Sequence, residues 1–255
     1  MLRFFRKIRS SLLNRDSYPK YLIYAIGEIV LVMLGILLAL QVNNWNETRQ
    51  EILYEKSTLL ALKEDFQENQ KELEKTLGQQ NRVISFNTKL LEWFIENDPQ
   101  NLADSVGAYL FRGAYSFFRP ELILGSYNAL IGVGRTDLIK NKDLRKRLAE
   151  FSSDVESGFE DHDHSMLLTA NMEQMTSPYA AYLVPNDYFK LELNFNQEKE
   201  RHQKALLGLM EEKAFISLLI QKTAIEKLRL YRQEKLLRRC NKILADITTE
   251  LEKHP

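Results

Sequence analysis

The sequence predicts an all-α protein, with one N-terminal transmembrane helix followed by an extracytoplasmic helical bundle that has long amphipathic helices. Three observations favour this fold class. Glycine and proline, which long helices avoid, number only 10 and 6 in 255 residues. Residues 21–42 are apolar enough to span a membrane. Apolar residues then recur at helical spacing through most of the remaining chain.

Composition limits the classes of function. Lys and Arg together number 35, as do Asp and Glu, so the formal net charge is zero. Because nucleic-acid-binding proteins usually carry a basic surface, we expect no nucleic-acid partner. The single cysteine, Cys240, cannot form an internal disulfide and lies on an apolar stripe, so we interpret it as a buried hydrophobic side chain. No cofactor is indicated.

The transmembrane helix is predicted over residues 21–42, which reach about 33 Å at about 1.5 Å per residue, against a hydrocarbon core of about 30 Å. Thirteen of these residues are Leu, Ile or Val, and their summed preference for lipid outweighs the cost of Glu28. The run is long for a signal peptide and no Ala-x-Ala site follows it, so we expect an uncleaved anchor. The alternative is a buried core helix of a soluble protein.

Flanking charge predicts the orientation of this anchor. Residues 1–20 carry six Lys or Arg and one Asp, whereas the stretch after the anchor mixes both signs. Because positive flanks stay in the cytoplasm, we expect residues 1–20 inside and a helical domain of residues 43–255 outside, in the periplasm. The basic segment is either a short helix on the anionic inner leaflet or an unstructured flank.

Three residues of the anchor suggest a helix-packing face. Glu28 is an ionisable group at membrane depth, and such groups usually mark a contact or a path. Gly35 and Ala39 form a small-xxx-small pair, which lets a second helix approach closely. We therefore predict that Glu28, Gly35 and Ala39 pack against another copy of the chain or another membrane protein. The alternative is that Glu28 reaches toward the lipid headgroups.

After the anchor, a long amphipathic helix is expected over residues 45–77, which lack Pro and Gly. Asn69 occupies a stripe position where an apolar residue is expected, which favours a globular bundle over a strict coiled coil. Gly78 predicts a break or a bend. Apolar residues repeat along this helix every seven positions, at Ile52, Leu59, Phe66 and Leu73.

Further helices are predicted, in order, at about residues 83–97, 102–111, 120–132, 142–160 and 197–252. Pro120 suits the first turn of the third. Gly132 and Gly134 suit its C-cap, and Asn141 suits the N-cap of the fourth. Residues 113–119 and 179–188 are expected to be irregular.

The last helix has one apolar face with heptad-like spacing, formed by Leu230, Leu237, Cys240, Leu244, Ile247 and Leu251. Charged residues lie on its other faces. We interpret these charges, Glu226 and Arg229 included, as solvated surface with pairs at i and i+4.

One cluster has the residue types of a metal site, Glu160-Asp161-His162-Asp163-His164. On a helix, His162 and His164 point about 200° apart, so they cannot share an ion. Glu160 and His164 can, but two ligands do not close a site. We interpret the cluster as a polar helix face. The sequence contains no nucleophile elbow, P-loop or dinucleotide-binding glycine motif, and we expect no enzyme.

Aromatic residues gather in the less regular middle of the chain. They either line a groove for a ligand or partner or fill the core between helices, and the core is the commoner role. They are Tyr115, Phe117, Phe118, Tyr127, Tyr179, Tyr182, Tyr188 and Phe189.

The opening of the chain resembles a family of uncharacterised bacterial single-pass membrane proteins, known only as a domain of unknown function. The resemblance is carried by GEIVLV at residues 27–32 and GILLALQVNNWNE at residues 35–47, preceded by FFRKIR at residues 4–9. A weaker likeness continues in SYNAL at residues 126–130, Gly134 and DLIKN at residues 137–141. The resemblance implies a bacterial inner-membrane protein with an extracytoplasmic helical domain, and it implies no activity.

These observations predict a membrane-anchored interaction or scaffold protein of the bacterial cell envelope, whose partners are the lipid bilayer and itself or another membrane protein. A small-molecule sensor domain is the first alternative. Since about 20 residues lie on the cytoplasmic side, such a sensor requires a partner protein to pass its signal on. A metal-dependent hydrolase built around His162 and His164 is the second alternative.

Overall fold

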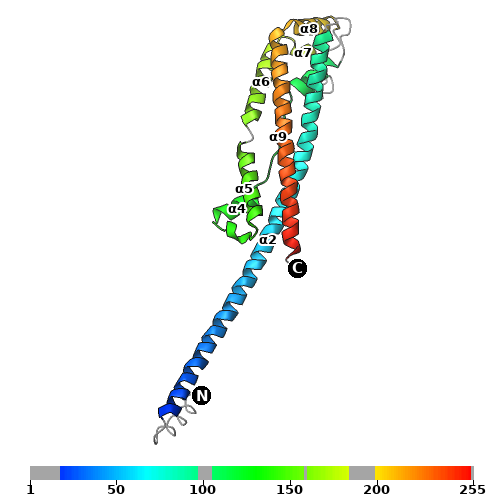
Figure 1. The fold of residues 1–255 in the computed structure, drawn as a ribbon. Coiled ribbons are helices and arrows are strands. Elements are labelled where there is room, and N and C mark those ends of the chain that lie inside the picture. Colours follow the sequence, from blue (N-terminus) through cyan, green and yellow to red (C-terminus); the bar gives the residue numbers. More distant parts are fainter. Residues whose placement is uncertain (1–17, 97–104, 158–159, 184–198, 254–255) are drawn as a thin grey trace. The chain divides into compact units, whose positions relative to one another are not determined.

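The computed structural model describes residues 18–96, 105–157, 160–183 and 199–253, and no β-strand occurs among them. The all-α class is thereby confirmed. The chain divides into two compact units, residues 1–55 and residues 56–255. The helices in chain order are α2 (Tyr18–Glu96), α3 (Val106–Tyr109), the π-helical turn η1 (Leu110–Ala114), α4 (Gly125–Gly132), the 3-10 helix η2 (Thr136–Leu138), α5 (Lys142–Ser157), α6 (Glu160–Thr176), α7 (Ala180–Leu183), α8 (Lys199–Glu211) and α9 (Lys213–Glu252) (Figure 1).

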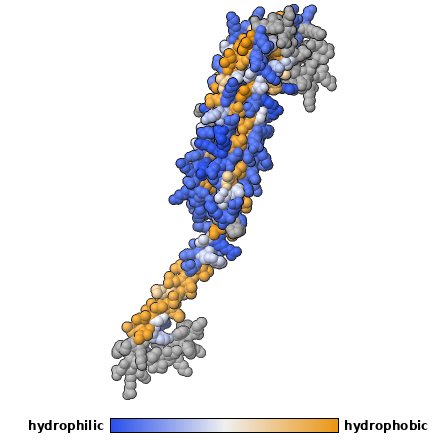
Figure 2. Space-filling view, turned by 45° about the vertical axis from the view of Figure 1, so that its right-hand side comes forward, coloured by the Kyte–Doolittle hydropathy of each residue, from blue (hydrophilic) through white to orange (hydrophobic). Residues whose placement is uncertain are grey.

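In the first unit, α2 contains an apolar stretch that is long enough to cross a membrane, and no other helix in the described residues has one. No side chain of residues 22–54 is buried. Figure 2 shows the resulting apolar surface along this part of α2. Since water does not tolerate so large an exposed apolar surface, α2 is a candidate membrane anchor. Residues 1–17, which include most of the basic segment, lie outside the described residues.

The polar stretch that follows the apolar one keeps its side chains bonded within the helix. Asn43 Nδ2 donates to Glu47 Oε1 at 2.8 Å. The Arg49 guanidinium lies 6.0 Å from the centre of the Trp45 ring, within cation–π range. These local contacts let α2 continue through the change from apolar to polar sequence without a break.

In the second unit, α2 pairs with α9 in antiparallel fashion (Figure 1). Gln70 Nε2 donates to Asn241 Oδ1 at 2.9 Å, and further along α2 the side chain of Gln80 contacts Glu226. Positions on α9 therefore decrease as positions on α2 increase. Residues 59, 62, 66, 69 and 73 of α2 are all buried, which is the 3-4 spacing of helices packed side by side.

Helices α5 and α6 lie end to end along α9 and run opposite to it (Figure 1). The Arg147 Nη1 of α5 is 2.9 Å from Asp246 Oδ2 near the end of α9. Asp161, at the start of α6, pairs with Arg232 nearer the middle of α9. Together the two helices thus cover one side of α9. Residues 158–159, which lie between them in the chain, are outside the described residues.

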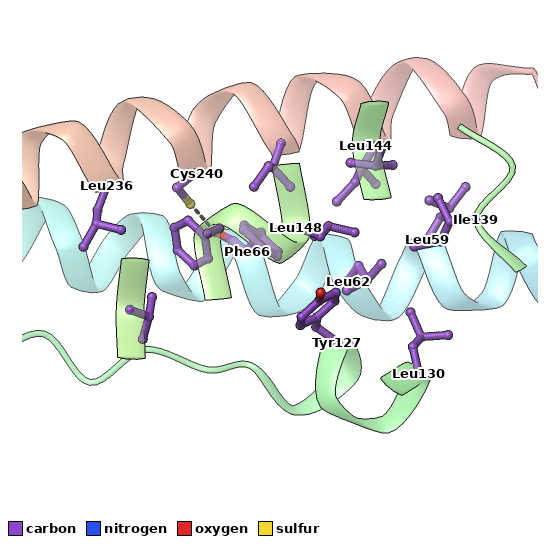
Figure 3. Close-up of a cluster of buried hydrophobic side chains, with 14 of the residues drawn as sticks. Leu59, Leu62, Phe66, Tyr127, Leu130, Ile139, Leu144, Leu148, Leu236 and Cys240 are labelled. Carbon is purple, nitrogen blue, oxygen red and sulfur yellow. Dashed lines mark hydrogen bonds between the residues drawn. The ribbon is translucent and has the colours of Figure 1, made fainter. Parts of the chain in front are cut away.

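The interior contains two separate apolar clusters. The first lies between α2, α4, α5 and the second half of α9, and Figure 3 shows its side chains, among them Leu62, Phe66, Leu148 and Cys240. The Cys240 thiol donates to the backbone oxygen of Phe66 at 3.3 Å, which confirms that this cysteine is buried. The second cluster joins the end of α2 to η1, α8 and the start of α9, with Leu90, Leu110, Leu206 and Phe215 at its centre.

Asn69 explains the polar residue in the stripe of α2. Its Nδ2 donates to the backbone oxygen of Ile123 at 2.7 Å, and its Oδ1 accepts from the backbone N–H of Ile123 at 2.6 Å. One helical turn earlier, Asp65 Oδ2 accepts from the backbone N–H of Ser126 at 2.8 Å. The amide of Asn69 thus satisfies both backbone groups of a residue in the irregular stretch before α4, as a neighbouring strand would.

This contact makes a first prediction. Replacing Asn69 with Ala removes two hydrogen bonds to the backbone of Ile123, a residue that is itself partly exposed, at a net cost of about 0.5–1.5 kcal/mol for each bond. We expect urea unfolding of the full chain in detergent, followed by circular dichroism, to show at least that loss of stability. The matched control is Asn81→Ala, whose side chain is exposed on the same helix. Equal effects of the two substitutions would contradict this role of Asn69.

Three expected boundaries were wrong. Gly78 neither breaks nor bends α2 into separate helices, because buried residues on both sides of it, Thr76 and Gln80, keep the helix packed. The predicted helices 45–77 and 83–97 are therefore both part of α2. Pro120 does not begin a helix, since α4 starts at Gly125 and residues 116–124 have no regular secondary structure, with the backbone of Ile123 bonded to Asn69. The last helical region is two helices, which meet at Glu212.

Other local predictions were confirmed. Asn141 Oδ1 accepts from the backbone N–H groups of Asp143 and Leu144, at 2.9 and 3.0 Å, and so caps α5. Gly134, with a φ of +65°, follows α4 in the left-handed conformation that glycine adopts readily. The expected helix at residues 102–111 begins outside the described residues, and its described part is α3 and η1.

Candidate functional site

A layer of buried polar side chains separates the two apolar clusters. On α9 the interior positions between Leu219 and Leu236 are taken by Lys222, Glu226, Arg229 and Gln233, whose exposed fractions are 0, 0, 5 and 6%. These positions follow the 3-4 spacing of the apolar ones before and after them, at residues 215, 219, 236, 240, 243 and 247. The layer therefore belongs to the core of the bundle.

Glu226 is at the centre of this layer. Its carboxylate lies 2.7 Å from Lys222 Nζ and 2.8 Å from Arg229 Nη1. It also accepts hydrogen bonds from the Ser165 hydroxyl of α6 and from the Gln80 amide of α2. Three helices thus meet at one carboxylate, and every donor around it comes from a different turn or a different helix.

The charged groups of the layer shift one another's pKa values. Burial acts to raise the pKa of Glu226, but the positive charges of Lys222 and Arg229 outweigh it and hold that pKa below its ordinary value. Burial lowers the pKa of Lys222, against the attraction of Glu226. Breaking a buried ion pair leaves a charge uncompensated, so the single carboxylate is the partner on which both cations depend.

A second prediction follows from this imbalance. Glu226→Gln leaves two buried cations without a counter-charge and is expected to destabilise the domain by about 3–5 kcal/mol. Lys222→Met leaves the pair of Glu226 and Arg229 intact and is expected to cost much less. The measurement is urea unfolding of the full chain in detergent. The control is Glu234→Gln, since Glu234 is an exposed partner of Arg238 at 3.9 Å. A larger loss for Lys222→Met than for Glu226→Gln would contradict this account.

The same pair predicts a pH dependence. A carboxyl group whose folded pKa is lowered contributes stability above its ordinary pKa of about 4.3, and the contribution disappears as the pH falls through the folded value. The stability difference between the wild type and Glu226→Gln is therefore expected to be constant from pH 6 to 8 and to shrink in acid. A difference that persists unchanged at the lowest pH at which the wild type folds would rule out this linkage.

Arg229 extends from the layer toward a cleft. Its Nη2 donates to the backbone oxygen of Phe118 and lies 3.3 Å from His162 Nδ1. Burial, then the charges of Arg229 and Arg119, lower the pKa of His162, which favours a neutral ring. The cleft has a volume of about 290 Å³ and is lined by Arg119, Pro120, Asp154, Ser157, Asp161, His162, Arg229, Arg232, Gln233, Lys235 and Leu236.

The residues suggested as metal ligands do not come together. His162 faces Arg229 and the ring of Phe117, with ring centres 5.4 Å apart, whereas His164 is exposed. The side chain of Glu160 lies outside the described ones. Across the described residues, no group of three or more His, Cys, Asp or Glu side chains is arranged to hold a metal ion.

The anchor residues Glu28 and Gly35 lie on the exposed surface of α2, as does Ala39. A methyl group added at Gly35 would meet no atom within 4 Å. The predicted packing face is therefore open in the single chain, and packing against a second helix stays a prediction.

The described aromatic residues divide between the two apolar clusters and the surroundings of the polar layer. Tyr127 is buried in the first apolar cluster, and Tyr115, Tyr179 and Tyr182 pack against the second. The Tyr115 hydroxyl bonds to Thr176, and burial raises the pKa of this phenol well above its usual range. Phe117 lies beside the polar layer, 5.7 Å from Lys222 Nζ. Tyr188 and Phe189 lie outside the described residues.

The interpretation of Glu226 and Arg229 as solvated surface was wrong, since both are buried. Lys222, Glu226 and Arg229 occupy positions that continue the heptad spacing of the buried apolar residues on either side. This spacing is the sequence signal from which their burial could have been predicted. The apolar face predicted for this helix is confirmed in its second half: Cys240 and Ile247 are buried, and Leu237, Leu244 and Leu251 pack against the first cluster. Towards its first half, Arg229 is buried beside the predicted Leu230.

Residues 28–153 of the chain match the model of a family of unknown function, DUF6090, which covers just under half of the chain. The matched region begins at Glu28 and ends within α5. No curated protein and no solved structure matches the chain.

Proposed function

We propose that this protein is a membrane-anchored helical interaction protein of the bacterial cell envelope, which associates with a second copy of itself through α2 and acts by binding rather than by catalysis. The observation that supports this proposal most is a group of exposed apolar side chains beyond the anchor, Ile52, Leu53 and Tyr54, which are 43, 58 and 59% exposed.

Lipid does not cover these three side chains. From Val42 to Ile52, α2 rises about 15 Å, whereas the headgroup layer beyond the hydrocarbon is about 5–8 Å thick on each side. Trp45, only three residues past Val42, is at the depth that interfacial aromatic residues prefer. An apolar group that lies beyond the headgroups faces water unless another protein surface covers it.

A second copy of α2 is the occupant that fits. Two copies anchored in one membrane present the same helix at the same depth and in the same direction. On a straight helix of about 3.6 residues per turn, Glu28, Gly35, Ala39 and Leu53 lie within about 40° of one another. The small residues allow close approach inside the lipid, and Leu53 continues the contact outside it.

Cysteine cross-linking provides the third prediction, and the natural thiol does not interfere. Burial, with a further contribution from Glu74, raises the pKa of Cys240 to about 12, so this thiol is unreactive at neutral pH. In isolated membranes treated with a mild oxidant, we expect Leu53→Cys to form a disulfide-linked dimer. The matched control is Glu51→Cys, which is exposed on the same turn but points about 160° away.

Equal cross-linking at both positions, or none at position 53, would sink the proposal of a dimer through this face. Within the Leu53→Cys background, Gly35→Leu is expected to lower the dimer yield, because it fills the space through which the helices approach. Glu28→Gln tests whether the carboxyl group contributes to the same contact.

The proposed location has its own test, the fourth prediction. With the basic segment inside, residues 43–255 are in the periplasm of a bacterial inner membrane. A periplasm-active alkaline phosphatase fused after Pro255 is expected to be active, and a cytoplasm-active reporter at the same position is expected to be inactive. The reverse pattern would overturn the orientation.

Small-molecule sensing is the second candidate function, and the cleft beside the polar layer favours it. A ligand that contacts Arg229 changes the surroundings of Glu226, where α2, α6 and α9 meet. Because α2 is also the candidate anchor, a signal passed on by such a ligand has a direct covalent route to the membrane.

A further inference from the structure

The cleft at the edge of the polar layer has an excess of positive charge. Four of the side chains that line it are cationic and two are carboxylates. Both carboxylates are engaged by arginines: Asp161 pairs with Arg232, and Asp154 pairs with Arg239, which lies outside the lining. At the buried end of the cleft, Arg229 shares the carboxylate of Glu226 with Lys222. An anion in the cleft would meet more positive than negative charge.

Arg229 is held in place before any ligand arrives. It is 5% exposed, its Nη1 donates to both oxygens of Glu226, and its Nη2 donates to the backbone oxygen of Phe118. A guanidinium fixed in this way loses little side-chain entropy on binding. Arg232, about one turn further along the same helix, and Lys235, nearly two turns further, are exposed and line the more open part of the cleft.

Gln233 adds an uncharged hydrogen-bonding group to the cleft. This residue lines the cleft, is 6% exposed, and its Oε1 has no hydrogen-bond partner. A buried amide oxygen without a donor costs stability, and a rotation of the Gln233 side chain toward the cleft would let a ligand hydroxyl or ammonium group supply that donor. The volume of about 290 Å³ is at the lower limit of ordinary ligand sites, which are about 300–1,000 Å³.

We propose that this cleft is a binding site for a small organic anion, a molecule that carries a carboxylate or phosphate group toward Arg229, Arg232 and Lys235 and a hydrogen-bond donor toward Gln233. The proposal rests on the sensing candidate and is independent of dimer formation through α2.

The test is equilibrium dialysis of the full chain in detergent against radiolabelled inorganic phosphate, acetate or lactate, at constant ionic strength set with chloride. We expect saturable binding of phosphate or lactate at about one equivalent per chain, in the millimolar range. Arg232→Gln and Lys235→Gln are each expected to weaken it at least about fivefold. Both residues lie on the open side of the cleft, so these variants keep the buried pair of Glu226 and Arg229.

Arg238→Gln is the matched control. Arg238 is on the same helix, is 62% exposed and does not line the cleft, so binding is expected to be unchanged. Gln233→Leu is expected to reduce the affinity for lactate to that for acetate, which lacks the hydroxyl. A phosphate-specific signal identifies a phosphate ligand, and a lactate-specific signal identifies a hydroxy acid.

Absence of saturable binding for all three probes would overturn the proposal, as would binding that Arg232→Gln and Lys235→Gln leave unchanged or that Arg238→Gln weakens equally. The cross-linking of Leu53→Cys separates this result from the dimer. Loss of anion binding in Arg232→Gln with an unchanged dimer yield shows two separate sites.

Discussion

The structure of the helical domain depends on the carboxylate of Glu226. It accepts from two cations and two neutral donors, which come from α2, α6 and α9, and it is fully buried. A buried charge is tolerated only where its partners are in place, so these helices have one register in which the layer closes. Sliding α9 by one heptad against α2 would separate this carboxylate from the amide of Gln80. The apolar clusters on either side supply most of the stabilisation, but they accept many registers, and the layer selects one.

The same arrangement makes the layer a sensitive part of an otherwise ordinary bundle. The two cations share one counter-charge, and one of them, Arg229, also reaches the cleft. A negative charge placed there from outside would relieve an imbalance that the chain carries on its own. Stability and protonation are therefore linked through one guanidinium to the proposed ligand site, whereas the proposed association through α2 uses residues of the other unit.

Sequence reasoning identified the fold class because helix formation is local. The scarcity of Gly and Pro, the apolar anchor stretch and the heptads of α2 all survive in the structure. It failed where a long-range contact decided the outcome. Pro120 is a good first residue for a helix, yet the backbone of Ile123 bonds to Asn69, 51 positions before Pro120, instead of within a helix. Gly78 is a weak helix former, yet packing on both sides keeps α2 continuous. The polar layer was not predicted because charged side chains were expected to be exposed, although their heptad spacing places them on the buried face of α9.

The contact between Asn69 and Ile123 also fixes the length of the chain just before α4. Two side chains one turn apart on α2, Asp65 and Asn69, hold two backbone positions, Ser126 and Ile123, three residues apart. A helix turn has a fixed pitch, so the stretch between these two positions has a fixed length. An insertion or deletion between Ile123 and Ser126 would therefore break one of the two contacts. Both sides of this contact lie inside residues 28–153, the region that matches the family model.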